Sequence, residues 1–181
     1  MKVHLDSAQH RMEKAIEAFE HHLTQVRTGR ANPSILSEIE IEYYGMMTPL
    51  NQVSQISVVE GKQLVVKPFE SSILKAIEKA VNMANLGLSP QNDGTVIRLN
   101  VPSLTEETRR DLSKQVSKMA EEAKVAIRNV RREVNDSIKK DDTLTEDMEK
   151  SALDKVQKTT DEFIKKVDAV AESKTKEIMT V

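Results

Sequence analysis

The sequence predicts an α+β protein, in which a small α/β domain of β-α-β type is inserted into a long three-helix bundle. Apolar residues recur at steps of three and four in three segments, which begin near residues 5, 105 and 145. This spacing is typical of amphipathic helices. Between residues 31 and 102 the pattern changes to alternation and short apolar runs, which predict strands. Gly29 and Pro33 mark the first junction between the two patterns, and Pro102 marks the second.

The first predicted helix runs from about Leu5 to Thr28. Gly29 favours a helix end at this point, and Pro33 disfavours continuation because its nitrogen cannot donate a backbone hydrogen bond. The apolar stripe of this helix consists of Leu5, Ala8, Met12, Ala15, Phe19, Leu23 and Val26. A helix with one such stripe must pack it against another element.

The middle region begins with a half-buried strand at 38–43, where glutamate and apolar residues alternate. Two apolar runs follow at 56–59 and 63–66. They flank a short polar segment that contains Gly61, which predicts a hairpin with glycine in its turn. This part of the chain is therefore expected to form a sheet.

A helix is expected next, and either Ser71 or Ser72 can cap it. Its apolar positions are Ile73, Ile77, Val81 and Ala84. Gly87 is expected at its C-terminal end, where a left-handed residue is common. Asn92-Asp93-Gly94 is expected to turn into a final strand at 95–101.

Helical spacing returns after Pro102. One helix is expected from Thr105 to about Lys140, with Thr105 as its N-cap. Its apolar seam consists of Leu112, Val116, Met119, Ala123, Ala126, Val130 and Val134. After a break at 141–143, Thr145 is expected to cap a last helix. The stripe of that helix consists of Leu153, Val156, Thr160, Phe163, Val167 and Val170.

None of the three helices can bury its stripe alone, so we expect them to form a bundle domain from residues 1–30 and 104–181. Residues 31–103 then form the inserted domain, which is attached through two adjacent connections. Short paired connections allow rocking, and a hinge consists of a few residues at element ends. The predicted hinge residues are Gly29, Ala31, Pro33, Pro102 and Ser103.

The composition excludes several classes of protein. The chain has 181 residues, no cysteine and a formal net charge of -2. Disulfides, thiolate metal sites and thiol nucleophiles are therefore excluded. No apolar run approaches the roughly 20 residues of a membrane helix, and the N-terminal residues lack the apolar core of a signal peptide. We therefore expect a cytoplasmic protein without membrane contact.

No motif predicts catalysis, nucleotide binding or metal binding. A P-loop, a Gly-x-Gly-x-x-Gly run and a nucleophile elbow are all absent from the sequence. The four histidines are His4, His10, His21 and His22. They lack the i, i+4 spacing of a zinc helix, and we interpret them as exposed helical residues. We expect no enzymatic activity, no cofactor, no metal and no small-molecule substrate.

Positive charge clusters between residues 124 and 132, where four cationic side chains and no acid occur. Their spacing of four, three and one predicts one helical face. They are Lys124, Arg128, Arg131 and Arg132. Arginine suits phosphate because its planar group can donate two hydrogen bonds at once. The alternative is a solvated face with helix-stabilising charge pairs, but such a face should mix both signs.

Two further arginine pairs lie near the predicted hinge and are candidate RNA or hinge contacts: Arg27 with Arg30, and Arg109 with Arg110. Aromatic residues make up only 3% of the chain, and tryptophan is absent. The chain therefore lacks the stacking surfaces of a single-strand binder. Contact with the phosphates and the shape of duplex-rich RNA fits better.

Several runs along the chain resemble the ribosome recycling factor family. They are Arg27-Thr28-Gly29-Arg30-Ala31, Tyr43-Tyr44-Gly45, Leu86-Gly87-Leu88-Ser89-Pro90, Gly94-Thr95-Val96-Ile97-Arg98, Leu104-Thr105-Glu106-Glu107 and Val125-Ala126-Ile127-Arg128-Asn129-Val130-Arg131-Arg132. Each run alone is weak, but their order over nearly the whole chain is specific. Thr108 departs from the family pattern, which commonly has arginine there, and Glu133-Val134 stands where Asp-Ala is common.

The resemblance implies two domains joined at a mobile elbow, in an L shape like transfer RNA. It implies a monomer that binds the ribosome after termination, with its bundle against large-subunit rRNA. Together with elongation factor G, which hydrolyses GTP, such a factor splits the ribosome into subunits and so releases mRNA and tRNA. By motif, the rRNA-contacting arginines correspond to Arg128, Arg131 and Arg132. The alternative function is a cytoplasmic coiled-coil adaptor that binds protein partners, which the one-sign arginine face disfavours.

Overall fold

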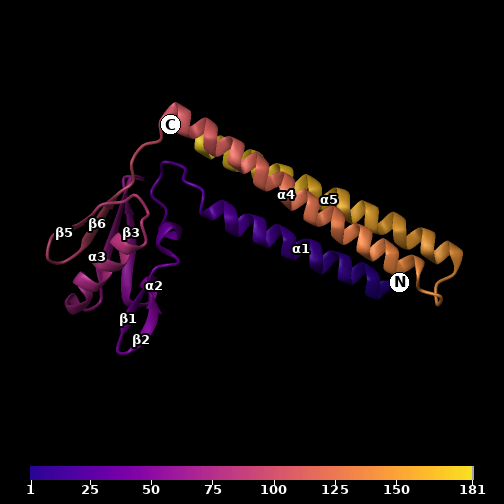
Figure 1. Cartoon of the computed structure of the whole chain (residues 1–181), viewed down its shortest axis with the longest axis horizontal. Coiled ribbons are helices and arrows are strands. Elements are labelled where there is room, and N and C mark those ends of the chain that lie inside the picture. Colours follow the sequence, from indigo (N-terminus) through magenta and orange to yellow (C-terminus); the bar gives the residue numbers. More distant parts are fainter. Residues whose placement is uncertain (181) are drawn as a thin grey trace. The chain divides into compact units, whose positions relative to one another are not determined.

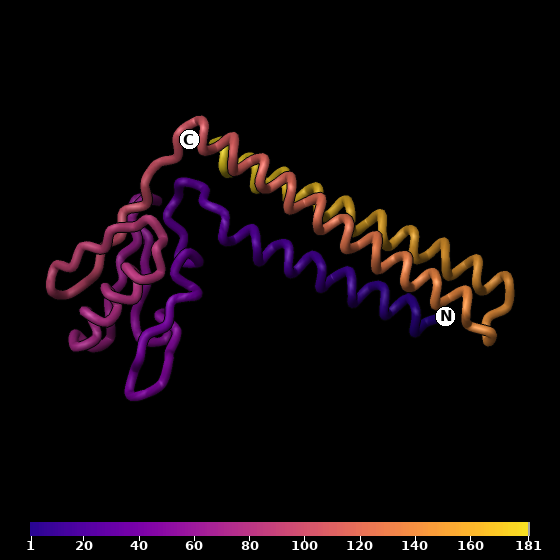
Figure 2. Tube along the Cα trace, viewed as in Figure 1, coloured from indigo at the N-terminus to yellow at the C-terminus, as the bar shows by residue number. Residues whose placement is uncertain are grey.

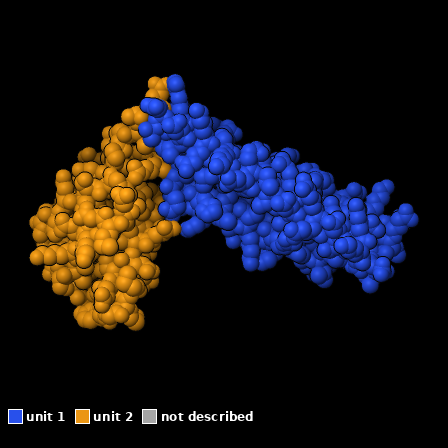
Figure 3. Space-filling view, viewed as in Figure 1, with its two compact units in different colours: residues 1–26, 107–181 blue, residues 27–106 orange. Residues whose placement is uncertain are grey.

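The computed structural model describes residues 1–180, which divide into two compact units (Figure 3). The helical unit contains Met1–Val26 and the residues from Glu107 onward, whereas the small unit contains Arg27–Glu106. Each unit has its own hydrophobic core, as the burial of their side chains shows. The fold thus has the class that the sequence predicts, a long helical bundle interrupted by a small unit of strands and one main helix.

The helical unit consists of three long helices that run side by side (Figures 1 and 2). They are α1 (Lys2–Thr24), α4 (Glu106–Lys139) and α5 (Glu146–Met179). An ion pair between Arg11 and Glu133 links α1 to α4, and a second one between Lys124 and Asp168 links α4 to α5. Helices α4 and α5 have 34 residues each, so each is about 50 Å long at 1.5 Å per residue.

The predicted seam of α4 is confirmed at most positions and wrong at one. Val116, Val130 and Val134 are buried, but Ala126 is exposed and Ile127 is fully buried in its place. Steps of three and four permit either position. The larger side chain removes more apolar surface from water, so its burial is favoured. A shift by one residue also occurs in α1, where Ile16 is buried and the predicted Ala15 is half-buried. In α5 the smaller Ala152 is buried and the predicted Leu153 is half-buried, so residue size does not decide the position there.

The helix ends follow the capping residues only in part. Thr145 caps α5 as predicted, and its Oγ1 accepts a hydrogen bond from the Met148 backbone nitrogen at 3.4 Å. Acids fill the first turn of α5, where the positive end of the helix dipole favours them. Helix α1 ends at Thr24, before the predicted end at Thr28.

The small unit contains two antiparallel sheets. One sheet pairs β1 (Glu40–Tyr43) with β2 (Met46–Pro49). The other has the order β3-β4-β6-β5, and its strands are β3 (Ser54–Val59), β4 (Gln63–Pro68), β5 (Pro90–Asn92) and β6 (Ile97–Asn100). The short helices are η1 (Pro33–Leu36), α2 (Leu50–Val53) and η2 (Ser71–Ile73), and the longer one is α3 (Leu74–Met83). Strands β2 and β5 are absent from the sequence-based prediction.

Two predicted features around α3 are wrong in detail. Ser71 and Ser72 lie inside the 3₁₀ turn η2, and α3 begins at Leu74 without a side-chain cap. Near the C-terminal end, Asn85 adopts the left-handed conformation with a φ of 50°. It can do so because asparagine tolerates this region. Gly87, with a φ of 70°, lies further along in the loop to β5.

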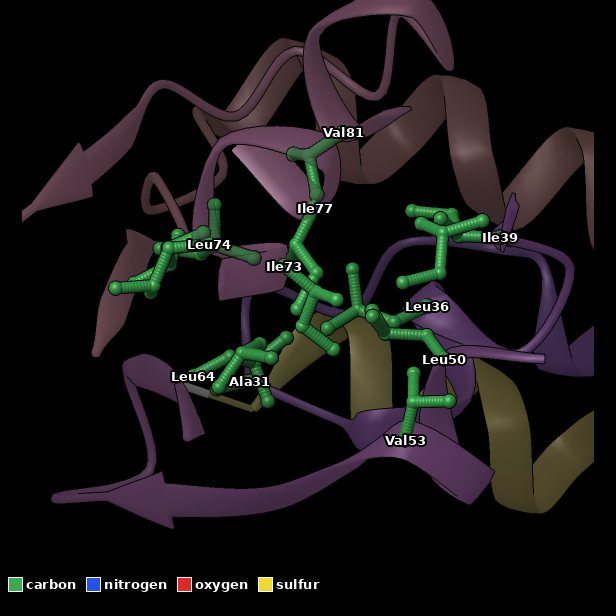
Figure 4. Close-up of a cluster of buried hydrophobic side chains, with 14 residues drawn as sticks. Ala31, Leu36, Ile39, Leu50, Val53, Leu64, Ile73, Leu74, Ile77 and Val81 are labelled. Atoms are coloured by element: carbon green, nitrogen blue, oxygen red, sulfur yellow. The ribbon is translucent and has the colours of Figure 1, made fainter. Parts of the chain in front are cut away.

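The core of the small unit lies between α3 and one face of the four-stranded sheet (Figure 4). Alternate residues of β4 and β6 are completely buried and point to this side: Leu64, Val66, Ile97 and Leu99. Ile73, Ile77 and Val81 approach them from η2 and α3. This alternation explains why the central strands could be recognised in the sequence, since a one-sided core imposes a period of two.

Candidate RNA-binding face of helix α4

Helix α4 places the four predicted cations along one side, next to its apolar seam. Ile127 and Val130 are buried in the bundle beneath them. Arg128 and Arg131 are half-buried, and Arg132 is exposed. The half-buried position lets the aliphatic part of an arginine pack on the helix while its guanidinium stays accessible. We name the side chains of Lys124, Arg128, Arg131 and Arg132 the cationic stripe.

Lys124 differs from the three arginines because its charge is compensated. Its side chain is only 15% exposed, and its Nζ forms ion pairs with Asp168 of α5 and with Glu121 Oε1, the latter at 3.2 Å. The hydrogen bond to Asp168 raises the pKa of Lys124 above its ordinary value. Glu121 is visible from the sequence as an i, i+3 partner, but Asp168 is brought in only by the packing of α5.

Arg131 is held in place without loss of charge. Its Nη1 donates a hydrogen bond to Gln157 Oε1 of α5 at 2.9 Å, and Gln157 Nε2 donates in turn to Asp161 Oδ1 at 2.9 Å. Because the glutamine is neutral, it does not compensate the positive charge of the arginine. Within residues 1–180, Arg128 and Arg132 have no hydrogen-bonded or ion-paired partner. The stripe therefore presents three arginines that can donate to an external anion.

Glu133, the acid nearest to Arg132 along α4, forms its ion pair outside the cationic stripe. Glu133 follows Arg132 directly, but its carboxylate pairs with Arg11 of α1. The spacing of Glu133 places it on the side of α4 opposite to the stripe. The bundle thus keeps this negative charge away from the three arginines.

The other candidate arginines do not join the stripe. Arg27 and Arg30 belong to the small unit, where the Arg27 guanidinium donates to the Leu86 carbonyl oxygen. Arg109 and Arg110 lie at the start of α4, several turns before the stripe. Arg109 is half-buried, and its Nε has no hydrogen-bond partner among the described residues.

Most of the predicted hinge residues are bonded or packed within the small unit. Gly29 adopts a φ of 74° and lies against Leu104, and the Ala31 nitrogen donates to the Gly61 carbonyl oxygen at 2.8 Å. Pro33 is the first residue of η1. Pro102 and Ser103 are exposed. Their part in a hinge stays a prediction.

One histidine has a contact that the sequence does not reveal. His4 Nε2 lies 2.7 Å from Asp141 Oδ2, which joins the start of α1 to the connection between α4 and α5. Hydrogen bonds from the Thr143 side chain, first, and from His4 lower the pKa of Asp141 to about 2. The two residues are far apart in sequence, so no local pattern could have paired them. The remaining three histidines are exposed, as predicted.

Comparison with known proteins identifies the class of this fold. A solution structure of a ribosome recycling factor has a TM-score of 0.84 and 40% sequence identity, covering 99% of this chain and 97% of that one. A second structure, of the T. thermophilus factor with E. coli elongation factor G bound to the E. coli post-termination complex, has a TM-score of 0.67, 45% identity and coverage of 99% and 98%. The two-unit fold is thus that of ribosome recycling factors.

Sequence comparison gives the same result. The ribosome recycling factor family model matches residues 19–179. The ribosome-recycling factor of Halalkalibacterium halodurans is 56% identical over 146 residues, 79% of each chain. That of Clostridium acetobutylicum is 49% identical over 174 residues, 94% of each chain. The chain belongs to the ribosome recycling factor family. None of its helices within residues 1–180 has the length and apolarity needed to span a membrane.

Proposed function

We propose that the chain binds the ribosome after termination and, with elongation factor G, splits it into subunits, so that mRNA and tRNA are released. Membership of the family carries this proposal, since the match spans residues 19–179. A similar structure contains a recycling factor together with elongation factor G on the post-termination complex. The partner supplies GTP hydrolysis, because this chain has no phosphate-cradling loop. The protein acts in the cytoplasm, as a monomer and not as an enzyme.

The cationic stripe is the part of the helical unit that fits rRNA. Arg128 and Arg132 are unpaired within residues 1–180, and Arg131 is oriented by a neutral glutamine. Each can therefore form charge-assisted hydrogen bonds to phosphate oxygens without first breaking an ion pair. Lys124 would have to leave Asp168 and Glu121. We therefore assign phosphate contact to the three arginines and give Lys124 the role of holding α5 against α4.

Splitting requires that one part of the protein stays on rRNA while another part moves. In this proposal, the helical unit, which ends at Val26 and resumes at Glu107, stays anchored, and the small unit of Arg27–Glu106 is displaced by elongation factor G. The two connections between these domains form the hinge. Rotation about this hinge would carry force to the contacts between the ribosomal subunits.

Co-sedimentation with purified large ribosomal subunits tests the anchoring step. The protein should bind without nucleotide, and its affinity should fall steeply as salt rises, since phosphate contacts release counterions. Replacing one arginine of the stripe should reduce the slope of the logarithm of affinity against the logarithm of salt concentration by about 1. Salt-insensitive binding, or binding to a protein partner alone, would instead support the helical adaptor.

A further inference from the structure

The connection that follows α1 is bound tightly to the small unit. Ala31 is buried in the core of that unit, and its nitrogen donates to the Gly61 carbonyl oxygen at 2.8 Å. In the returning connection, the Val101 nitrogen donates to the Lys62 carbonyl oxygen at 2.9 Å. The turn between β3 and β4 therefore holds both connections. This arrangement leaves little freedom in residues that the sequence identifies as hinge candidates.

Gly29 brings the two connections together. A Cβ atom at this glycine would lie 3.3 Å from Leu104 Cγ, which is tighter than an ordinary contact. Its φ of 74° is in the left-handed region that favours glycine. The backbone at Gly29 thus packs directly on the returning connection just before α4 begins. The two connections behave as one packed pair within the small unit.

Arg27 provides the outermost attachment, immediately after the helical unit ends at Val26. Its guanidinium donates to the Leu86 carbonyl oxygen and lies over Gly87. A Cβ atom at Gly87 would come within 2.8 Å of Arg27 Nη2 and 3.2 Å of Nη1, so the arginine occupies the space that glycine leaves open. Leu86 and Leu88 on either side pack against the core of the small unit.

We propose that Arg27 is a positioning residue that clamps the first connection to the α3–β5 loop, so that rotation between the units is confined to the residues outside the clamp. Gly29 and Ala31 then move together with the small unit. The first connection bends at Gln25 and Val26, and the second bends between Leu104 and α4. Gly87 is part of the clamp because a side chain there would displace the guanidinium.

The clamp has a function if the chain splits ribosomes, and in this respect it depends on the proposed function. Displacement of the small unit is transmitted fully to α1 only if the first connection is rigid. A flexible connection would change its own conformation and transmit only part of the displacement. The hydrogen bond from the charged Arg27 favours the closed clamp by about tenfold. Its loss should free Arg27 and Thr28, whereas Gly29 stays packed on Leu104 and Ala31 stays bonded to Gly61.

The width of the distribution of distances between the units tests the clamp. The chain has no native cysteine, so spin labels can be attached at Gln52→Cys in the small unit and Lys118→Cys in the helical unit, both at exposed positions. Double electron–electron resonance should give a broader distribution for Arg27→Ala than for the parent protein. Gly87→Ala should also broaden it, through displacement of the guanidinium and through backbone strain at a φ of 70°. In the Arg27→Ala background only the contribution of that strain should remain.

Arg30→Ala is the matched control, since it removes an exposed arginine three residues away that forms no hydrogen bond or ion pair with another residue of 1–180. It should leave the distribution unchanged. An unchanged distribution in Arg27→Ala, confirmed as folded by circular dichroism, would overturn the clamp, as would equal broadening by Arg30→Ala.

With elongation factor G and GTP, Arg27→Ala should lower the maximal splitting rate several-fold and leave the half-saturating ribosome concentration unchanged. If the parent protein fails to split ribosomes, the proposed function fails, whereas the distance measurement still decides the clamp.

Discussion

Truncation of Arg128 or Arg131 to alanine should weaken binding to the large ribosomal subunit by about 1.5–3 kcal/mol, the usual contribution of a charged hydrogen bond. Both side chains lie beside the seam and not in it, so the free energy of unfolding should change by about 0.5 kcal/mol or less. Equilibrium binding and urea unfolding measure the two quantities separately. Unchanged affinity in both variants would remove the stripe from the mechanism.

Lys124→Ala is the informative comparison for these arginines. Its ion pairs with Asp168 and Glu121 are lost in the variant, which should lower stability by up to about 1 kcal/mol. Ribosome affinity should fall less than in Arg128→Ala, because the lysine charge is already compensated inside the bundle. A larger loss of affinity for Lys124→Ala than for Arg128→Ala would show that the ion pairs open on the ribosome.

Tyr44 shows strain at a single residue. It occupies the first position of the two-residue turn between β1 and β2, with a φ of 48°, and Gly45 follows with 80°. Turns of this type favour Asn-Gly, because asparagine tolerates positive φ. Tyr44→Asn and Tyr44→Ala both lose the contact with the Tyr43 ring, whose centroid is 4.6 Å away. The asparagine variant should be more stable than the alanine variant by about 1 kcal/mol in urea unfolding. Equal stability would mean that the turn stores no strain.

At the scale of elements, the hydrogen bonds that Asp141 accepts from Thr143 and from His4 make this end of the bundle sensitive to acid. Asp141 has a pKa of about 2 in the folded chain, compared with 3.8 for an ordinary aspartate. A lowered folded pKa contributes stability above the ordinary pKa, and this contribution is lost as pH falls toward the folded value. Asp141→Asn should therefore be less stable than the parent protein above pH 3.8, and the difference should shrink toward pH 2. A difference that is constant with pH would exclude this linkage.

The sequence predicts elements well where burial imposes a period, and poorly where pairing alone defines the element. Strands β4 and β6 bury alternate residues, so their pattern is readable. The edge strand β5 has only three residues, begins with Pro90 and buries none of them fully, and β2 also lacks a fully buried residue. Only their backbone hydrogen bonds to a neighbouring strand define them. Such pairing depends on the fold of the whole unit.

The candidate site shows the same division. The spacing of Arg128, Arg131 and Arg132 on one helix face follows from the sequence, because a face is a local property. The compensation of Lys124 by Asp168 does not follow from it, since it depends on how α5 packs against α4. The choice of Ile127 over Ala126 for the core is likewise decided by packing. The sequence pattern of one helix therefore cannot predict contacts that depend on the packing of other helices.

At the scale of the whole molecule, a reversible crosslink between the units should separate binding from splitting. A cysteine pair, one residue in each unit and away from the cationic stripe, can be oxidised to a disulfide because the chain has no other cysteine. The oxidised protein should bind ribosomes but fail to split them with elongation factor G and GTP, and reduction should restore splitting. Each single-cysteine variant serves as a control for the substitution itself. Normal splitting by the crosslinked form would exclude rotation as the working step.

The insertion of the small unit between α1 and α4 also determines the order in which the protein can fold during its synthesis. Residues Arg27–Glu106 are contiguous, so their core can form as soon as they leave the ribosome. Helix α1 emerges first but must wait for α5, at about 5–20 residues per second, so its apolar stripe lacks its partners for on the order of ten seconds. During this interval we expect the apolar stripe of the nascent helix to stay accessible to chaperones, whereas the contiguous small unit can bury its own core.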